Sequence, residues 1–178
     1  STLVDRIVPG YPKDEIEEYN NQLDYQDNLI VSAEVFLLWV IEGGDDLKAK
    51  LPFSKTSLDV KIVDDMQPYR TRKVRILNGA HTTMVPFSLL YGNVTVKETV
   101  DNSFTGSFIN AAVFEEIIET LQMDTEELNS FAEEVLDRFR NPFIKHKLAD
   151  IALNSISKFK VRVLPSILEY VNIHNKVP

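Results

Sequence analysis

The spacing of hydrophobic and polar residues divides the chain into two parts with different periods. In the first part, residues 3–8 are predicted to be extended and to end at the turn pair Pro9-Gly10, and residues 58–63 alternate as a half-buried strand. Residues 29–41 are rich in β-branched and aromatic side chains and predict one or two buried strands. Residues 13–23 are charged, with apolar positions at helical spacing, and predict a short solvent-facing helix.

After Asp65 the apolar positions take the period of an α-helix. Asp65 can cap a helix, Pro68 suits its first turn, and the periodic run continues until Gly92 ends it. Gly79 and Pro86 interrupt this run. Because an interior proline removes a hydrogen bond and clashes with the preceding turn, we expect a kink or a break near Pro86.

The remaining sequence is also helical in pattern. Residues 104–121 predict a helix, and Asp124 resembles the start of a capping box that opens another helix ending near Arg140. Pro142 is predicted to begin the next helix, to about Ile156, and Pro165 the last one. Five phenylalanines of this part are expected in the core of a helical bundle: Phe104, Phe108, Phe131, Phe139 and Phe143. The fold class is therefore mainly α, preceded by a small strand-containing segment.

Composition narrows the classes of function. The chain has 178 residues, 44 % hydrophobic and 26 % charged, which is typical of a folded globular domain. It has no cysteine, which excludes a disulfide scaffold, a cysteine-ligated metal site and a cysteine nucleophile. With 19 Lys and Arg against 27 Asp and Glu, the formal net charge is −8. This charge disfavours non-specific binding to nucleic acid or to an anionic membrane.

Nothing in the sequence resembles a membrane span or a signal peptide. The longest apolar stretch, residues 35–41, is too short to cross a bilayer, and no basic-then-apolar leader opens the chain. We therefore expect a soluble, cytoplasmic domain. The chain begins at Ser1 without a methionine and runs directly into strand-like sequence, so we also expect it to be a segment of a longer polypeptide.

One predicted helix carries three side chains that could perform chemistry. At about 100° per residue, Asn78 lies roughly 140° and His81 roughly 80° around the axis from Lys73, so all three share one broad side. A desolvated lysine can act as an acid or base near neutral pH, and an amide and an imidazole can hold a substrate oxygen. Gly79 fits the close approach of a ligand or another backbone. Spacing alone equally allows a solvated lysine, a surface amide and a structural histidine.

A resemblance decides between these readings. The spacing of Lys73, Asn78 and His81 resembles the signature helix of the polyol-specific long-chain dehydrogenase family, also called the mannitol dehydrogenase family. Residues 4–9, Val-Asp-Arg-Ile-Val-Pro, resemble that family's second signature. Within the family, residues 72–82 and 138–146 look most like the tagaturonate reductases (altronate oxidoreductases).

The resemblance implies a two-domain oxidoreductase of carbohydrate metabolism with NAD as cofactor. No Gly-x-Gly-x-x-Gly motif is present, so residues 1–65 look like the tail of a Rossmann-type cofactor domain and its connecting strands, and 66–178 like the helical catalytic and substrate domain. The expected partners are the missing N-terminal domain and a sugar acid substrate. The implied reaction is reduction of D-tagaturonate to D-altronate, and this chain alone should be inactive. The alternatives are a fructuronate reductase, a mannitol-type dehydrogenase, or a non-catalytic helical binding domain.

The resemblance also assigns roles. It makes Lys73 the general acid and lets Asn78 and His81 orient the keto oxygen, and Asp5 matches an acidic position near the family active site. The other expected substrate-binding residues are Arg70, Arg138, Lys145 and His146. Arg70 could pair with a uronate carboxylate, although each of these cations could equally be a solvated surface charge. No metal site is expected, because the histidines are dispersed along the chain.

Overall fold

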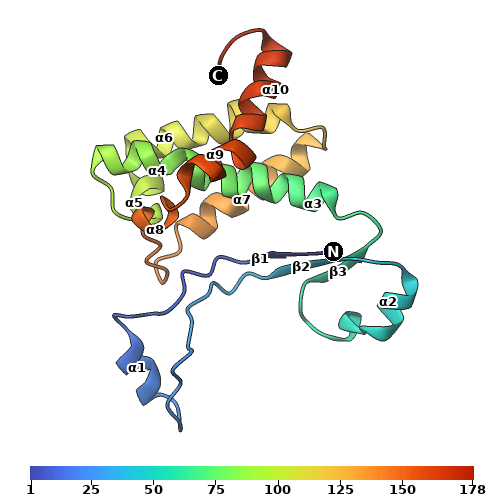
Figure 1. The fold of residues 1–178 in the computed structure, drawn as a ribbon, viewed down its shortest axis with the longest axis vertical. Helices are drawn as coiled ribbons and strands as arrows, with labels where there is room; N and C mark the ends of the chain where they lie inside the picture. The colour runs from blue at the N-terminus through green and yellow to red at the C-terminus, as the bar shows by residue number, and fades with distance from the viewer. The chain divides into compact units, whose positions relative to one another are not determined.

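The computed structural model describes all 178 residues and divides into two compact units, Ser1–Met66 and Gln67–Pro178 (Figure 1). The first unit contains all three strands of the protein, and the second is entirely helical. The mainly α fold with a small sheet, expected from the change of period after Asp65, is confirmed.

The sheet of the first unit has the order β1-β2-β3. Strand β1 (Thr2–Asp5) runs antiparallel to β2 (Leu38–Glu42), and β3 (Val60–Val63) runs parallel to β2 on its other side. The central strand is hydrogen-bonded on both edges and is the most apolar of the three, with Val40 fully buried.

The rest of this unit is short helices and irregular chain: α1 (Ile16–Asn21), α2 (Asp45–Lys50) and the 3₁₀ turn η1 (Phe53–Lys55). The prediction of strands over residues 29–41 is correct only at its C-terminal end. Leu29 and Val35 are exposed, and residues 29–37 form only an isolated bridge between Gly10 and Ser32. β-branched residues favour extended chain, and Ser32 and Glu34 do donate backbone bonds to the Gly10 and Ile7 carbonyls, but this pairing does not extend into a strand ladder.

A long rod runs through the helical unit. It is built from α3 (Gln67–Arg72), the π-helix η2 (Lys73–Asn78) and α4 (Gly79–Tyr91), coloured green in Figure 1. Gly92 ends α4 in the left-handed conformation (φ 106°), as expected of a helix C-cap. The break expected at Pro86 is absent, because α4 continues through the proline. The departure from α-helical geometry lies instead at residues 73–78, which form the π-helix η2.

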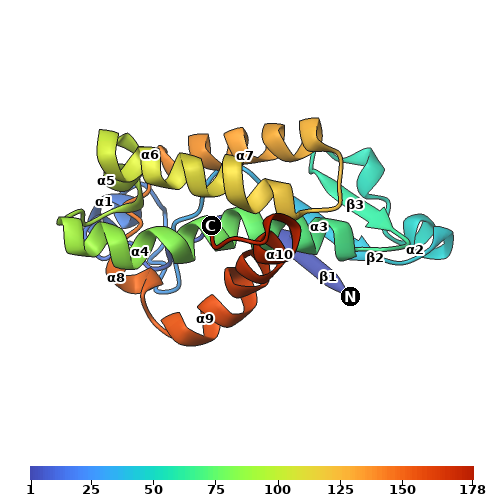
Figure 2. The same ribbon diagram turned by 90° about the horizontal axis from the view of Figure 1, so that it is seen from above.

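The other helices surround this rod: α5 (Val96–Asp101), α6 (Ser103–Ala111), the π-helix η3 (Ala112–Ile117), the 3₁₀ turn η4 (Ile118–Thr120), α7 (Thr125–Phe139), α8 (Leu148–Ile151), α9 (Ser155–Arg162) and α10 (Leu164–His174). Asp124 caps α7 by accepting the Glu127 N–H at 2.9 Å, as its sequence predicts. Helices α6 and α9 both pack on α4, from different sides (Figure 2). None of the helices has both the length and the apolar character that crossing a bilayer requires.

The helix predicted from Pro142 is wrong in its first half. Residues 141–147 form a loop, and α8 begins only at Leu148. Two backbone bonds tie this loop to the start of α5: Val96 N–H donates to the His146 carbonyl at 3.0 Å, and Leu148 N–H donates to the Val94 carbonyl at 2.9 Å. These non-local bonds satisfy the loop backbone in place of helical ones.

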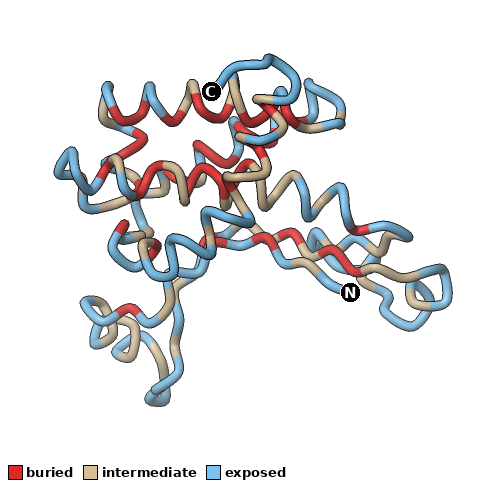
Figure 3. The backbone as a smooth tube through the Cα atoms, turned by 45° about the horizontal axis from the view of Figure 1, so that its top comes forward, coloured by how far each residue is buried: buried red, intermediate tan, exposed pale blue.

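The core of the helical unit follows the inward faces of the rod and its neighbours (Figure 3). Ile76, Met84 and Ile109 are among its fully buried side chains. Phe131 and Phe139 lie in this core as predicted, whereas Phe104, Phe108 and Phe143 are exposed, so the prediction was wrong for those three. Phe104 and Phe108 instead contact the Phe87 ring at the surface, with centroid distances of 5.5 and 4.5 Å.

Candidate functional site

The π-helix η2 brings Lys73 and Asn78 to the same side of the rod. Both are half-buried and occupy its two ends. In an α-helix, residues five apart point in different directions, but in a π-helix the backbone bonds join residue i to i+5, so such residues lie about one turn apart. The angle of roughly 140° assumed for an α-helix is therefore wrong, and the π-helical backbone brings the two positions closer together around the axis.

His81 follows on the first turn of α4 and is buried, with 5 % of its surface exposed. Its ring stacks on Phe139 of α7 at a centroid distance of 4.3 Å and an interplanar angle of 28°. The His146 ring meets it edge-on at 5.0 Å. The buried Nε2 atom of His81 has no hydrogen-bond partner, which leaves a polar atom at the site able to bind a ligand oxygen.

Positive charges surround His81. Burial lowers its pKa well below 6.5, and the neighbouring His146, Arg162, Arg138 and Lys158 lower it further. Burial also lowers the pKa of His146, while the Asp150 carboxylate partly opposes that effect. His81 is therefore a neutral imidazole at pH 7, with one N–H donor and one acceptor nitrogen.

Helix α9 supplies two of these cations. An added Cβ at Gly79 would lie 3.3 Å from the Arg162 carbonyl oxygen, so the glycine lets the end of α9 approach the rod closely. This confirms the close backbone approach that the sequence suggested. The Arg162 guanidinium reaches the Thr82 hydroxyl at 3.5 Å, and that hydroxyl donates to the Asn78 carbonyl at 2.8 Å. Arg162 is thereby linked to the end of the π-helix.

Arg75, within the π-helix, forms side-chain hydrogen bonds to two other helical segments. Its Nε donates to Ser166 Oγ on α10 at 2.8 Å, and its Nη2 to Thr120 Oγ1 at 3.4 Å. Burial lowers the pKa of Arg75, against the opposing effect of the Glu169 carboxylate. Because π-helical turns are rare and short, side-chain bonds of this kind help to hold one in place.

The structure brings some of the expected site residues together and leaves others apart. Arg138, half-buried near the end of α7, and His146, in the loop before α8, both act on His81. Lys145 is exposed in the same loop. Arg70 is exposed on α3 and is not among the charges that act on His81. Asp5 is buried on β1, in the first unit.

Sequence reasoning missed Lys158 and Arg162. Their signal was present, since they are two cations four residues apart on a helical segment and therefore share one face. One predicted helix ended near Ile156 and the next began at Pro165, so both cations fell outside the predicted helices and their shared face was not recognised. No group of three or more His, Asp or Glu side chains in the structure could hold a metal ion.

The lowered pKa values of His81 and His146 predict a loss of stability in acid. Below pH 6.5 the unfolded chain binds protons that the folded chain excludes, so the free energy of unfolding falls as pH falls toward the folded pKa values. The expected slope is up to about 1.4 kcal/mol per pH unit for each histidine. Denaturant unfolding at several pH values between about 7.5 and 5 measures it.

The matched variants for this test are His81→Phe and His174→Phe. His81→Phe removes a buried titrating group and should flatten the slope. His174→Phe replaces an exposed side chain and should not reduce the slope. His146 still titrates in His81→Phe, so a smaller slope should remain, and a slope as steep as that of the wild type would contradict the prediction.

The fold resembles part of two solved structures. It superposes on mannitol 2-dehydrogenase of Pseudomonas fluorescens, solved as a ternary complex with NAD and D-mannitol, with a TM-score of 0.79 and 23 % identity. The match covers 97 % of this chain and 35 % of that one. A D-sorbitol dehydrogenase in substrate-free form gives a TM-score of 0.78 with the same identity and coverage.

The sequence itself defines the family. The mannitol dehydrogenase C-terminal domain matches residues 65–177, and the chain belongs to this family. The altronate oxidoreductase of Bacillus subtilis is 52 % identical over all 178 residues, and that of Yersinia enterocolitica 49 %. The chain spans 37 % of the length of each of these relatives. The family resemblance inferred from the two signatures is thus confirmed.

Proposed function

We propose that the full-length protein is an NAD-dependent oxidoreductase that reduces D-tagaturonate to D-altronate, and that this chain supplies the acid and the groups that orient the substrate. The names of the most similar relatives support the substrate, and the ternary complex of the P. fluorescens enzyme supports the cofactor. The observation that carries the proposal is the rod itself: a π-helix aligns Lys73 with Asn78, next to a buried and neutral His81.

Each of the three side chains has a role in the reduction. Lys73, as an ammonium, donates a proton to the keto oxygen when that oxygen gains negative charge, and it takes the proton back in the reverse reaction. The Asn78 amide donates a hydrogen bond to the same oxygen. The neutral His81 presents an unpaired ring nitrogen, Nε2, that can bind a substrate hydroxyl or the keto oxygen.

The cofactor's binding residues are proposed to lie outside this chain, because it contains no glycine-rich phosphate-binding motif. When bound, NADH supplies the hydride that the carbonyl carbon receives. Asp5, Arg138, Lys145 and His146 are retained as proposed substrate-binding residues. The metabolic role suggested by these relatives fits a cytoplasmic enzyme. The 178-residue chain alone is expected to be inactive.

Initial rates of NADH oxidation by the full-length protein test this proposal. D-Tagaturonate should be reduced fastest, D-fructuronate more slowly, and D-fructose, which has no carboxylate, slowest. Faster reduction of D-fructuronate or D-fructose would assign the protein to the other branches of the family. Failure to oxidise NADH with any of the three would leave the helical unit as a binding domain.

A further inference from the structure

We infer that Lys158 and Arg162 on α9 form the subsite that binds the carboxylate of the sugar acid and so selects hexuronates over neutral ketoses. This inference rests on the proposed function, because it places the acidic end of the same substrate beside the proposed catalytic residues. Neither residue belongs to the motif of Lys73, Asn78 and His81 or to the substrate-binding residues expected from the sequence.

The first observation is position. Arg162 reaches the Thr82 hydroxyl at 3.5 Å, and Thr82 is adjacent in sequence to His81 on α4. Lys158 lies four residues before Arg162 on the eight-residue helix α9, so the two occupy one face. Both are close enough for their charges to act on the buried His81. A carboxylate bound between them would therefore lie beside the site that holds the keto oxygen.

The second observation is that neither charge is neutralised. The hydrogen bonds of these two side chains go to neutral acceptors: Lys158 Nζ donates to the Ile151 carbonyl at 2.7 Å, and Arg162 donates to a hydroxyl. Burial lowers the pKa of both groups, and Arg162 lowers that of Lys158 further. No carboxylate raises the pKa of either one. Like charges at this spacing repel each other, and a bound anion would relieve that repulsion.

The third observation separates this subsite from the earlier candidate. Arg70, which the sequence suggested for the carboxylate, is exposed to solvent, where an ion pair contributes little. Lys158 and Arg162 are half-buried, so charge-assisted bonds to a carboxylate are stronger there. Arg138 adds a further positive charge near His81. The carboxylate is therefore assigned to α9 and not to α3.

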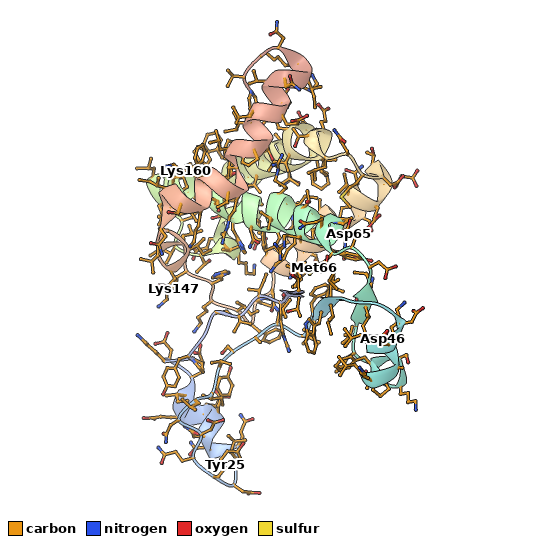
Figure 4. The ribbon with its side chains drawn as sticks, turned by 45° about the vertical axis from the view of Figure 1, so that its right-hand side comes forward. Tyr25, Asp46, Asp65, Met66, Lys147 and Lys160 are labelled. Carbon is orange, nitrogen blue, oxygen red and sulfur yellow. The ribbon has the colours of Figure 1, made fainter.

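Paired ligands test the inference. Calorimetric titration of the full-length protein, with NADH present so that neither ligand can be oxidised, uses D-altronate and D-altritol, which differ in the carboxylate. The variants are Arg162→Met and Lys158→Met, with Lys160→Met as the matched control, because Lys160 is exposed on the same helix (Figure 4). Each test variant should bind D-altronate at least about tenfold more weakly, since one charge-assisted bond is lost. D-Altritol binding and the Lys160→Met variant should be almost unchanged.

Kinetics complete the test. The KM for D-tagaturonate should rise in both variants with little change in kcat, and Arg162→Lys should restore most of the affinity. Equal weakening of D-altronate and D-altritol, or unchanged D-altronate binding, overturns the inference even if the wild type reduces D-tagaturonate. If the wild type binds D-altronate through Arg162 but reduces no hexuronate, the proposed function fails and the subsite stands.

Discussion

Replacing Lys73 by methionine in the full-length protein lowers kcat for D-tagaturonate reduction by about 10²- to 10⁴-fold, the usual contribution of a positioned general acid. Methionine keeps the length of the side chain and lacks the proton, so the half-buried position at the start of η2 remains filled. Stopped-flow or steady-state measurement of NADH oxidation gives the rate, and circular dichroism confirms that the variant is folded.

The matched control for this variant is Lys97→Met. Lys97 lies on α5, where it pairs with Asp101 at the surface, and its replacement should leave kcat within about twofold, as expected for the loss of one exposed ion pair. A folded Lys73→Met enzyme that keeps wild-type kcat would show that another group donates the proton.

Replacing Asn78 by alanine should lower kcat by about 10²- to 10³-fold, the cost of removing one hydrogen-bond donor to a developing oxyanion. The effect should fall on kcat more than on KM, because the amide bonds the oxygen most strongly when it is charged. Steady-state kinetics with D-tagaturonate separates the two constants.

Asn110→Ala is the control for the amide. Asn110 is also half-buried on a helix, where its side chain donates to the Gly106 carbonyl at 2.8 Å. This variant should be slightly less stable but fully active. If Asn78→Ala and Asn110→Ala lose activity equally, the role given to Asn78 is structural and the orienting function is wrong.

Much of the fold could be predicted because it depends on local signals. The structure contains the helices predicted from the apolar periodicity after Asp65 and the helix end at Gly92. It also contains the cap at Asp124 and the proline in the first turn of α10. Residues 29–37 and 141–147 were mispredicted because their conformation depends on distant partners. The loop before α8, for example, bonds the start of α5. No local pattern encodes such a contact.

The candidate site could also be predicted only in part. The spacing of Lys73, Asn78 and His81 indicated a shared face from sequence alone, but the π-helix that aligns the first two could not be predicted. It is stabilised by bonds from elsewhere, such as that of Arg75 to Ser166 on α10, 91 residues later in the chain. The cations of α9 were missed for a related reason: the approach of α9 to Gly79 becomes visible only in three dimensions.

A crystal structure of the full-length protein with NAD⁺ and D-altronate tests the central claim most directly. The account predicts the substrate hydroxyl that becomes the keto group within hydrogen-bond distance, about 2.6–3.2 Å, of both Lys73 Nζ and the Asn78 amide. It also predicts the carboxylate against Arg162 and Lys158. A substrate whose reacting hydroxyl contacts neither Lys73 nor Asn78, with another side chain in their place, would contradict it.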